Sequence, residues 1–306
     1  MYLKLVLAAC VLAFCAVALS AYARLADAGL GCANWPACYG ENALKERQPP
    51  QAGAPRGHTS WQWKLHGQVV QLLGLLAIVV CGVAWKKRRE QSPLLPTLLL
   101  GLMVFFAAFG IWAFSHLPRS VIVLVHLAGG IAMLMLLAWI ALRQMAPPAI
   151  AQAVRRKWRS LSWVGLMLLL LQIMLGGWVS SNFAALACTG FPLCNGAWLP
   201  PMDFSYSFGQ SGLQLSAERV TAIHWMHRAG ALLVVAYLGW LSFGIMTAQG
   251  LRNLGRAILG LALLQFALGI LNVLSGLSLP VTVLHNAVAM LLLVALTILV
   301  FRLRQA

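Results

Sequence analysis

Acidic side chains are scarce in this chain, which has 6 Asp and Glu residues against 22 Lys and Arg residues. Charged residues of both signs make up 9% of the sequence, whereas a soluble domain carries roughly 25%. Hydrophobic residues make up 61%, and they form repeated runs of about 20 residues, the length that a membrane-spanning helix needs. The composition therefore excludes an ordinary soluble domain and predicts an all-α polytopic membrane protein.

The sequence also lacks the alternating segments of about 10 residues that mark a transmembrane β-barrel. Eight helical spans are expected instead, at 2–22, 62–85, 94–114, 119–142, 160–181, 219–246, 255–276 and 279–302. The first run has features of a signal peptide, but it is interpreted as a span because the second half of the chain begins with a counterpart.

The formal net charge of +16 would indicate a nucleic-acid partner in a soluble protein. Here the basic residues gather in short loops after the second, fourth and sixth spans and at the C-terminus, which is typical of cytoplasmic loops. We therefore expect membrane lipid and no nucleic acid around the protein. The expected location is the bacterial inner membrane, with both termini cytoplasmic and the cysteine-containing loops outside.

An internal repeat is indicated by two cysteine motifs. Cys32-Ala-Asn-Trp-Pro-Ala-Cys38 and Cys188-Thr-Gly-Phe-Pro-Leu-Cys194 share their spacing and a central aromatic-Pro pair. The repeat predicts two pseudo-symmetric four-helix bundles, at 1–150 and 151–306, joined at Pro147-Pro148 and the basic run that follows. Because each half has an even number of spans, the halves share one orientation and form a parallel repeat.

Four histidines occur at matching depths in apolar spans. They are His66, His126, His227 and His285. Each lies 4 to 8 residues inside its expected span, roughly 6–12 Å below the outer surface at 1.5 Å per residue. Facing helices of a bundle can bind a cofactor between them, and heme iron accepts an imidazole on each face. The repeated set predicts two such histidine pairs, with Gly67, Gly129, Gly130 and Gly230 leaving room for a flat macrocycle.

Other interpretations of these histidines remain open. A single membrane histidine is often a hydrogen-bonded contact between helices. Zinc is a weaker alternative, because no Asp, Glu or Cys accompanies the histidines at this depth. His224 lies one turn before His227. It is a candidate to support a ligand or to contact a heme propionate, or it is a histidine at the membrane boundary without a role. His58 and His116 are expected to be solvated.

The paired cysteines fall in loops on the outer, oxidising side of the membrane, so we expect disulfides between Cys32 and Cys38 and between Cys188 and Cys194. Each bridge is either a structural staple or a redox-responsive pair. The remaining cysteines lie within spans and are expected to act as small packing residues; they are Cys10, Cys15 and Cys81.

With these features together, the chain resembles the heme A synthase family over nearly its whole length. The resemblance rests on the stretch from Arg24 to Gly40, on Ile223-His-Trp-Met-His227-Arg228, and on the segments that carry His126 and His285. It implies an oxidoreductase that converts heme O to heme A, by oxidation of a ring methyl to a formyl group, for cytochrome oxidase assembly.

The resemblance also implies a role for each half. His227 and His285 would ligate a heme b cofactor, and His66 and His126 would bracket the substrate heme O. Arg24 and Arg228 would pair with heme propionates, because a guanidinium group matches a carboxylate. Heme O synthase or cytochrome oxidase assembly factors are the implied partners, and a homo-oligomer is compatible with the sequence.

The chain departs from the family pattern in its second span. The family motif reads Glu-x-x-His-Arg, but here Trp63 replaces the glutamate and Gly67 replaces the arginine around His66. The catalytic residue of this half is therefore unassigned. One alternative is a heme-binding membrane protein of the same fold, serving electron transfer, heme chaperoning or oxidase assembly without this activity. Another is a small-solute transporter that uses Gln172, Gln265 and Asn272.

Overall fold

The protein is described by a computed structural model that covers residues 1–27, 61–145, 147–205 and 215–304. Within these ranges the chain is helical. The long helices are α1 (Tyr2–Asp27), α3 (Trp61–Lys86), α4 (Leu94–His116), α5 (Arg119–Arg143), α6 (Gln152–Ser181), α7 (Ala217–Met246), α8 (Arg252–Leu274) and α9 (Leu279–Arg304). A short 3₁₀ helix, η1 (Ala184–Leu186), follows α6. All eight long helices are long and apolar enough to cross a membrane, so the expected all-α integral membrane architecture is confirmed.

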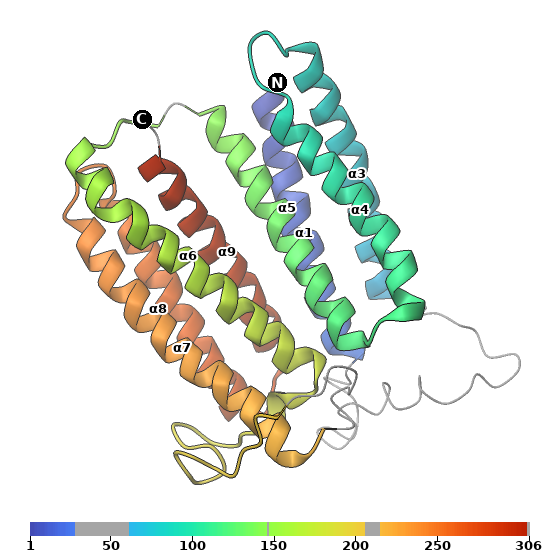
Figure 1. The fold of residues 1–306 in the computed structure, drawn as a ribbon, viewed down its shortest axis with the longest axis vertical. Coiled ribbons are helices and arrows are strands. Elements are labelled where there is room, and N and C mark those ends of the chain that lie inside the picture. The colour runs from blue at the N-terminus through green and yellow to red at the C-terminus, as the bar shows by residue number, and fades with distance from the viewer. Residues whose placement is uncertain (28–60, 146, 206–214, 305–306) are drawn as a thin grey trace, which may run out of the picture.

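The helices pack as two sets of four (Figure 1). In the N-terminal half, contacts run from α1 to α3, α4, α5 and back to α1. In the C-terminal half, they run in the same order from α6 to α7, α8, α9 and back to α6. The halves meet where α5 and α1 contact α9 and where α5 contacts α6. The domain boundary near residue 150 and the internal sequence repeat remain predictions.

Figure 1 places the N- and C-termini at the same end of the molecule. The connections from α3 to α4 and from α5 to α6 lie at that end as well, and the segment that follows α6 lies at the opposite end. Proline marks the start of two helices, since Pro93 precedes α4 and Pro118 precedes α5. Proline fits there because the first turn of a helix has no use for its missing N–H.

The start of the fifth span differs from the expectation. Helix α6 begins at Gln152, not near residue 160, so Arg155, Arg156 and Lys157 belong to its first turns and not to a linker. Arg and Lys are good helix formers. Hydropathy alone therefore places the start of a span too late where basic residues form the first turns of the helix.

The apolar core spans both halves. One continuous cluster of buried side chains includes Val6 and Ala77 in the N-terminal half and Leu241 and Leu296 in the C-terminal half. Helix α9 is the most enclosed of the eight spans, with 56% of an 18-residue apolar stretch buried. Because α9 contacts α1, α5, α6 and α8, it joins the two halves.

Candidate functional site

A cavity of about 770 Å³ opens between the helices, within the range of about 300–1,000 Å³ found for ligand and cofactor sites. All four predicted histidines border it: His66 on α3, His126 on α5, His227 on α7 and His285 on α9. Its other lining side chains are mostly apolar. The structure therefore brings both predicted pairs to one shared cavity.

The histidines of the N-terminal half are fixed by backbone carbonyl groups. His66 Nδ1 lies 3.0 Å from the carbonyl oxygen of Ala16, and His126 Nδ1 lies 3.0 Å from that of Ile122. A carbonyl oxygen only accepts hydrogen bonds, so each Nδ1 carries the proton and donates. Each Nε2 then keeps its lone pair, which is the form in which an imidazole binds a metal.

The histidines of the C-terminal half are held by glutamine side chains. Gln172 Nε2 lies 3.0 Å from His227 Nδ1, and Gln265 Nε2 lies 3.1 Å from His285 Nε2. Among the described residues, the second nitrogen of each ring has no hydrogen bond, and His285 Nδ1 is buried in that state. An amide N–H that donates to one ring nitrogen leaves the proton on the other, so iron can bind the free nitrogen only when the amide turns and its oxygen accepts from the ring N–H.

The rings of each predicted pair border the same cavity. Three glycines make room for these rings, because a Cβ added at Gly110, Gly176 or Gly269 would lie 3.2–3.3 Å from an imidazole atom. The residues present therefore fit a heme group with histidine ligands in either half.

Most of the glycines that were expected to receive the macrocycle have other neighbours. Gly129 adjoins the Phe106 ring and Gly230 adjoins the Gln172 amide, while Gly67 has no neighbour within 4 Å of an added Cβ. Of the predicted set, only Gly130 lines the cavity. That interpretation was wrong for Gly129 and Gly230, because sequence spacing did not reveal which helix face each glycine occupies; for Gly67, which has open space beside it, it stays a prediction.

Aromatic side chains surround the N-terminal histidines. The Trp63 ring meets the His66 ring edge-on, with centroids 5.9 Å apart. Phe106 and Phe109 lie 6.0 and 5.8 Å from the His126 ring. No Asp or Glu is among the described residues that line the cavity. Trp63 therefore stands beside His66 at the position where the family motif has a carboxylate.

Comparison with known proteins identifies the family. Residues 4–297 match the family described as cytochrome oxidase assembly protein. A heme A synthase from Shewanella oneidensis is 33% identical over 296 residues, which cover 91% of this chain and 89% of that protein. A heme A synthase from Halalkalibacterium halodurans is 27% identical over 88% of this chain and 86% of its own length.

The chain belongs to the heme A synthase family. The resemblance predicted from the cysteine and histidine motifs is confirmed over nearly the whole chain.

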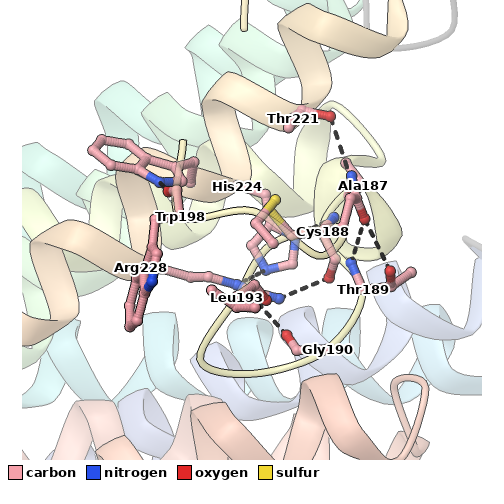
Figure 2. Close-up of a disulfide and its surroundings, with 12 residues drawn as sticks. Ala187, Cys188, Thr189, Gly190, Leu193, Trp198, Thr221, His224 and Arg228 are labelled. Atoms are coloured by element: carbon pink, nitrogen blue, oxygen red, sulfur yellow. Dashed lines mark hydrogen bonds between the residues drawn. A yellow bond between two sulfur atoms is a disulfide. The ribbon is translucent and has the colours of Figure 1, made fainter. Parts of the chain in front are cut away.

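The second predicted disulfide of this heme A synthase family member is present, between Cys188 and Cys194 (Figure 2). It closes a small loop beside the cavity, and Cys194 is one of the lining residues. Asn195 ties the loop together by accepting hydrogen bonds from the N–H and hydroxyl of Thr189. The predicted bridge between Cys32 and Cys38 lies outside the described residues.

Arg228 and His224 attach this loop to α7. The Arg228 guanidinium donates to the carbonyl oxygens of Cys188, Gly190 and Leu193 at 2.7, 2.9 and 3.2 Å. His224 Nδ1 accepts from the Cys188 N–H at 3.3 Å, and Figure 2 shows both side chains converging on the loop. His224 and Arg228 also border the cavity, as does Arg24. Their predicted contacts with heme propionates remain predictions.

Two side chains that hold histidines were not recognised from the sequence as part of the site. Gln172 and Gln265 appeared there only as polar residues of a hypothetical transport pathway, although both occur in a Gln-x-x-Leu-Gly sequence. That repeated pattern, in spans that neighbour the histidine spans, was the available signal. His116 lies at the end of α4, where its ring stacks on Trp112 with centroids 5.0 Å apart, and it does not line the cavity.

Proposed function

We propose that this protein is a heme A synthase, an oxidoreductase that converts heme O to heme A by oxidising a ring methyl to a formyl group. The observation that carries the proposal is the convergence of four histidines on one cavity in a chain whose relatives are heme A synthases. Heme A serves cytochrome oxidase, which agrees with the description of the matching family.

The two halves are assigned different hemes. His227 and His285 hold a heme b cofactor, and His66 and His126 bracket heme O. When bound, the iron supplies the redox chemistry. The protein contributes the orientation of the imidazoles and an apolar wall that excludes water. The carbonyl groups of Ala16 and Ile122 accept from Nδ1 of His66 and His126, which leaves the Nε2 lone pair of each ring free.

The heme propionates are assigned to the outer mouth of the cavity, where Arg24 and Arg228 lie among its lining residues. The hydrogen bonds of Arg228 engage the disulfide loop and His224. In this assignment, Arg228 positions the loop over the C-terminal heme.

The protein is placed in the bacterial inner membrane with both termini in the cytoplasm. The basic clusters around Lys86–Arg89 and Arg155–Arg159 support this orientation, because positive residues are retained on the cytoplasmic side. Heme O synthase is the proposed supplier of substrate, and oxidase assembly factors are the proposed recipients of product. Alkaline phosphatase fused after Arg304 should be inactive if the C-terminus is cytoplasmic; an active fusion would reverse the orientation.

The activity is tested by expressing the chain beside a heme O synthase in a host without its own heme A synthase. Extracted hemes are separated by chromatography. Heme A should accumulate, and it should be absent from cells that carry the empty vector. Heme O alone, with the protein present in the membrane, would reject the proposed reaction.

A second candidate function is favoured by the residues at the family motif. Trp63 and Gly67 stand where that motif has a glutamate and an arginine, and the nearest alternatives, Glu41 and Glu46, lie outside the described residues. A buried carboxylate could move a proton or stabilise positive charge. Trp63 has no titratable group, so it can neither take up a proton nor carry the negative charge of a carboxylate. The alternative is a heme-binding electron-transfer or assembly protein, and heme O as sole extracted product, together with stably bound heme b, would support it.

A further inference from the structure

Two helices that line the C-terminal half carry the same short pattern. Helix α6 contains Gln172-Ile-Met-Leu-Gly176, and α8 contains Gln265-Phe-Ala-Leu-Gly269. Residues four apart lie on one face of a helix. Each pattern faces one histidine of the neighbouring helix, with Gln172 and Gly176 against His227 on α7, and Gln265 and Gly269 against His285 on α9.

The contacts around His227 fix both its ring and its backbone. The Gln172 amide donates to the carbonyl oxygen of His227 at 2.9 Å as well as contacting the ring nitrogen Nδ1. Gly176 lies against the Cε1 edge of the same ring, where an added Cβ would be 3.2 Å away. On α7, Gly230 is required for this arrangement, because a Cβ there would collide with Gln172 Oε1.

The contacts around His285 also pair a glutamine with a glycine, but this glutamine meets the ring nitrogen Nε2, whereas Gln172 meets Nδ1 of His227. Gln265 Nε2 lies 3.1 Å from the ring nitrogen Nε2, and a Cβ added at Gly269 would lie 3.3 Å from the Cε1 atom. Gln265 Oε1 and Gln172 Oε1 are both buried and have no hydrogen-bond partner among the described residues. Each amide thus holds a spare acceptor next to an imidazole, and a carboxamide can serve a ring nitrogen as donor or acceptor.

In the N-terminal half, the hydrogen bonds of His66 and His126 to described residues go to backbone carbonyl groups and not to amide side chains. Helix α4 keeps the glycine, since Gly110 lies against His126, but Phe106 stands four residues before it. His66 is held by the Ala16 carbonyl group alone among its recorded hydrogen bonds. A carbonyl group only accepts, so the ring nitrogen that contacts it must carry the proton. An amide can donate or accept, so each amide in the C-terminal half can contact a ring nitrogen with or without a proton.

We propose that Gln172 and Gln265 are positioning residues for the heme ligands of the C-terminal half, each acting with the glycine one turn later on its helix. This inference rests on the proposed assignment of a heme b to His227 and His285. The glycine admits the ring edge, and the amide fixes the ring's rotation. When iron is bound, the amide would present its oxygen Oε1, which is buried without a partner among the described residues, to accept from the ring N–H.

The test uses full-length purified protein with Gln172→Met or Gln265→Met, which keep the chain length and remove the polar contacts. Gln71→Met on α3 is the matched control, because Gln71 is exposed and does not line the cavity. Transfer of heme b to excess apomyoglobin measures heme loss, and electron paramagnetic resonance of the oxidised protein reports the ligand environment. Loss of a ligand's outer partner typically weakens metal binding by about 10–100-fold, so each variant should lose heme b at least about tenfold faster and show shifted low-spin g values.

Wild-type rates and g values in both variants would overturn the inference, and so would faster heme loss with unchanged g values, which indicates packing alone. If a methionine variant fails to fold, Gln172→Asn or Gln265→Asn, one methylene shorter, should give the same g-value shift. His227→Ala distinguishes a failure of this inference from a failure of the proposed C-terminal heme site. If it loses heme b while the glutamine variants behave as wild type, only this inference fails; if it retains all heme b, the proposed C-terminal heme site fails.

Discussion

The guanidinium group of Arg228 donates a 2.7 Å hydrogen bond to the carbonyl oxygen of Cys188, and thereby links the residue after His227 to the disulfide loop. The same group also donates to Gly190 and Leu193. One side chain on α7 thus satisfies three carbonyl groups of a loop that has little regular structure of its own. The residue that anchors the loop, Arg228, thus directly follows the proposed heme ligand His227 in α7.

Replacing Arg228 should loosen the disulfide loop. Arg228→Ala removes hydrogen bonds from a charged donor, worth about 1.5–3 kcal/mol, which corresponds to roughly a tenfold or larger rise in loop opening. The rate at which dithiothreitol reduces the Cys188–Cys194 bridge, followed by alkylation and mass spectrometry, should rise accordingly. Arg252→Ala at the start of α8 is the control, and equal rates in the two variants would contradict the anchoring role.

The glycines that face the histidine rings should not tolerate a methyl group. Gly269→Ala would bring a Cβ to 3.3 Å from His285 Cε1, so the ring must move, and overpacking of this kind costs roughly 1–3 kcal/mol. Gly260→Ala on the same helix meets no atom within 4 Å. The first variant should bind less heme and unfold at lower temperature than the second. Identical heme content and melting temperature would show that ring packing at Gly269 is unimportant.

Restoring the family motif should raise activity if the missing carboxylate limits turnover. The double variant Trp63→Glu with Gly67→Arg places the two family residues around His66. Gly67 has no atom within 4 Å of an added Cβ, so a larger side chain can start there without a clash. Heme A formed per cell beside a heme O synthase should increase over the wild-type chain. No increase from a well-folded double variant would argue against a lost-carboxylate explanation.

The segment around Asp203 should remain attached to Arg219 at the start of α7 in mild acid. Hydrogen bonds from Ser205, followed by those from Arg219, lower the pKa of Asp203 to about 2 from 3.8, and Arg219 Nε donates to Asp203 Oδ2 at 2.7 Å. Because the folded-state pKa is depressed, the stabilisation is complete above about pH 4 and is lost as the pH falls towards 2. The difference in melting temperature between wild type and Asp203→Asn should stay constant from pH 7 to 5 and shrink below pH 4. A difference that disappears already near pH 5 would contradict this pKa.

The number and type of helices follow directly from the sequence, because a bilayer requires long apolar runs and every backbone polar group must be satisfied within the helix. The expected start of the eighth span, at residue 279, coincides with the start of α9. The start of α6 at Gln152 was missed, since the run from Arg155 to Arg159 is polar yet compatible with a helix. Hydropathy reports where lipid surrounds a helix, not where the helix begins.

The histidines were found from their repeated positions, but their partners were not. His227 and Gln172 are 55 residues apart and come from different helices, so no local pattern joins them. The glycine predictions failed for the same reason, as Gly129 and Gly230 admit the side chains of Phe106 and Gln172 instead of a macrocycle. Contacts between helices depend on the rotation of each helix about its axis, which weakly amphipathic membrane spans do not reveal.

The central claim, that imidazoles in this cavity bind heme iron, is tested most directly by the heme content of purified His227→Ala protein. His116→Ala is the control, because His116 does not line the cavity. The wild type and the control should show the absorbance of low-spin heme with two histidine ligands, and His227→Ala should lose most of its bound heme while remaining folded in the membrane. Full heme retention and an unchanged spectrum in His227→Ala would contradict the account.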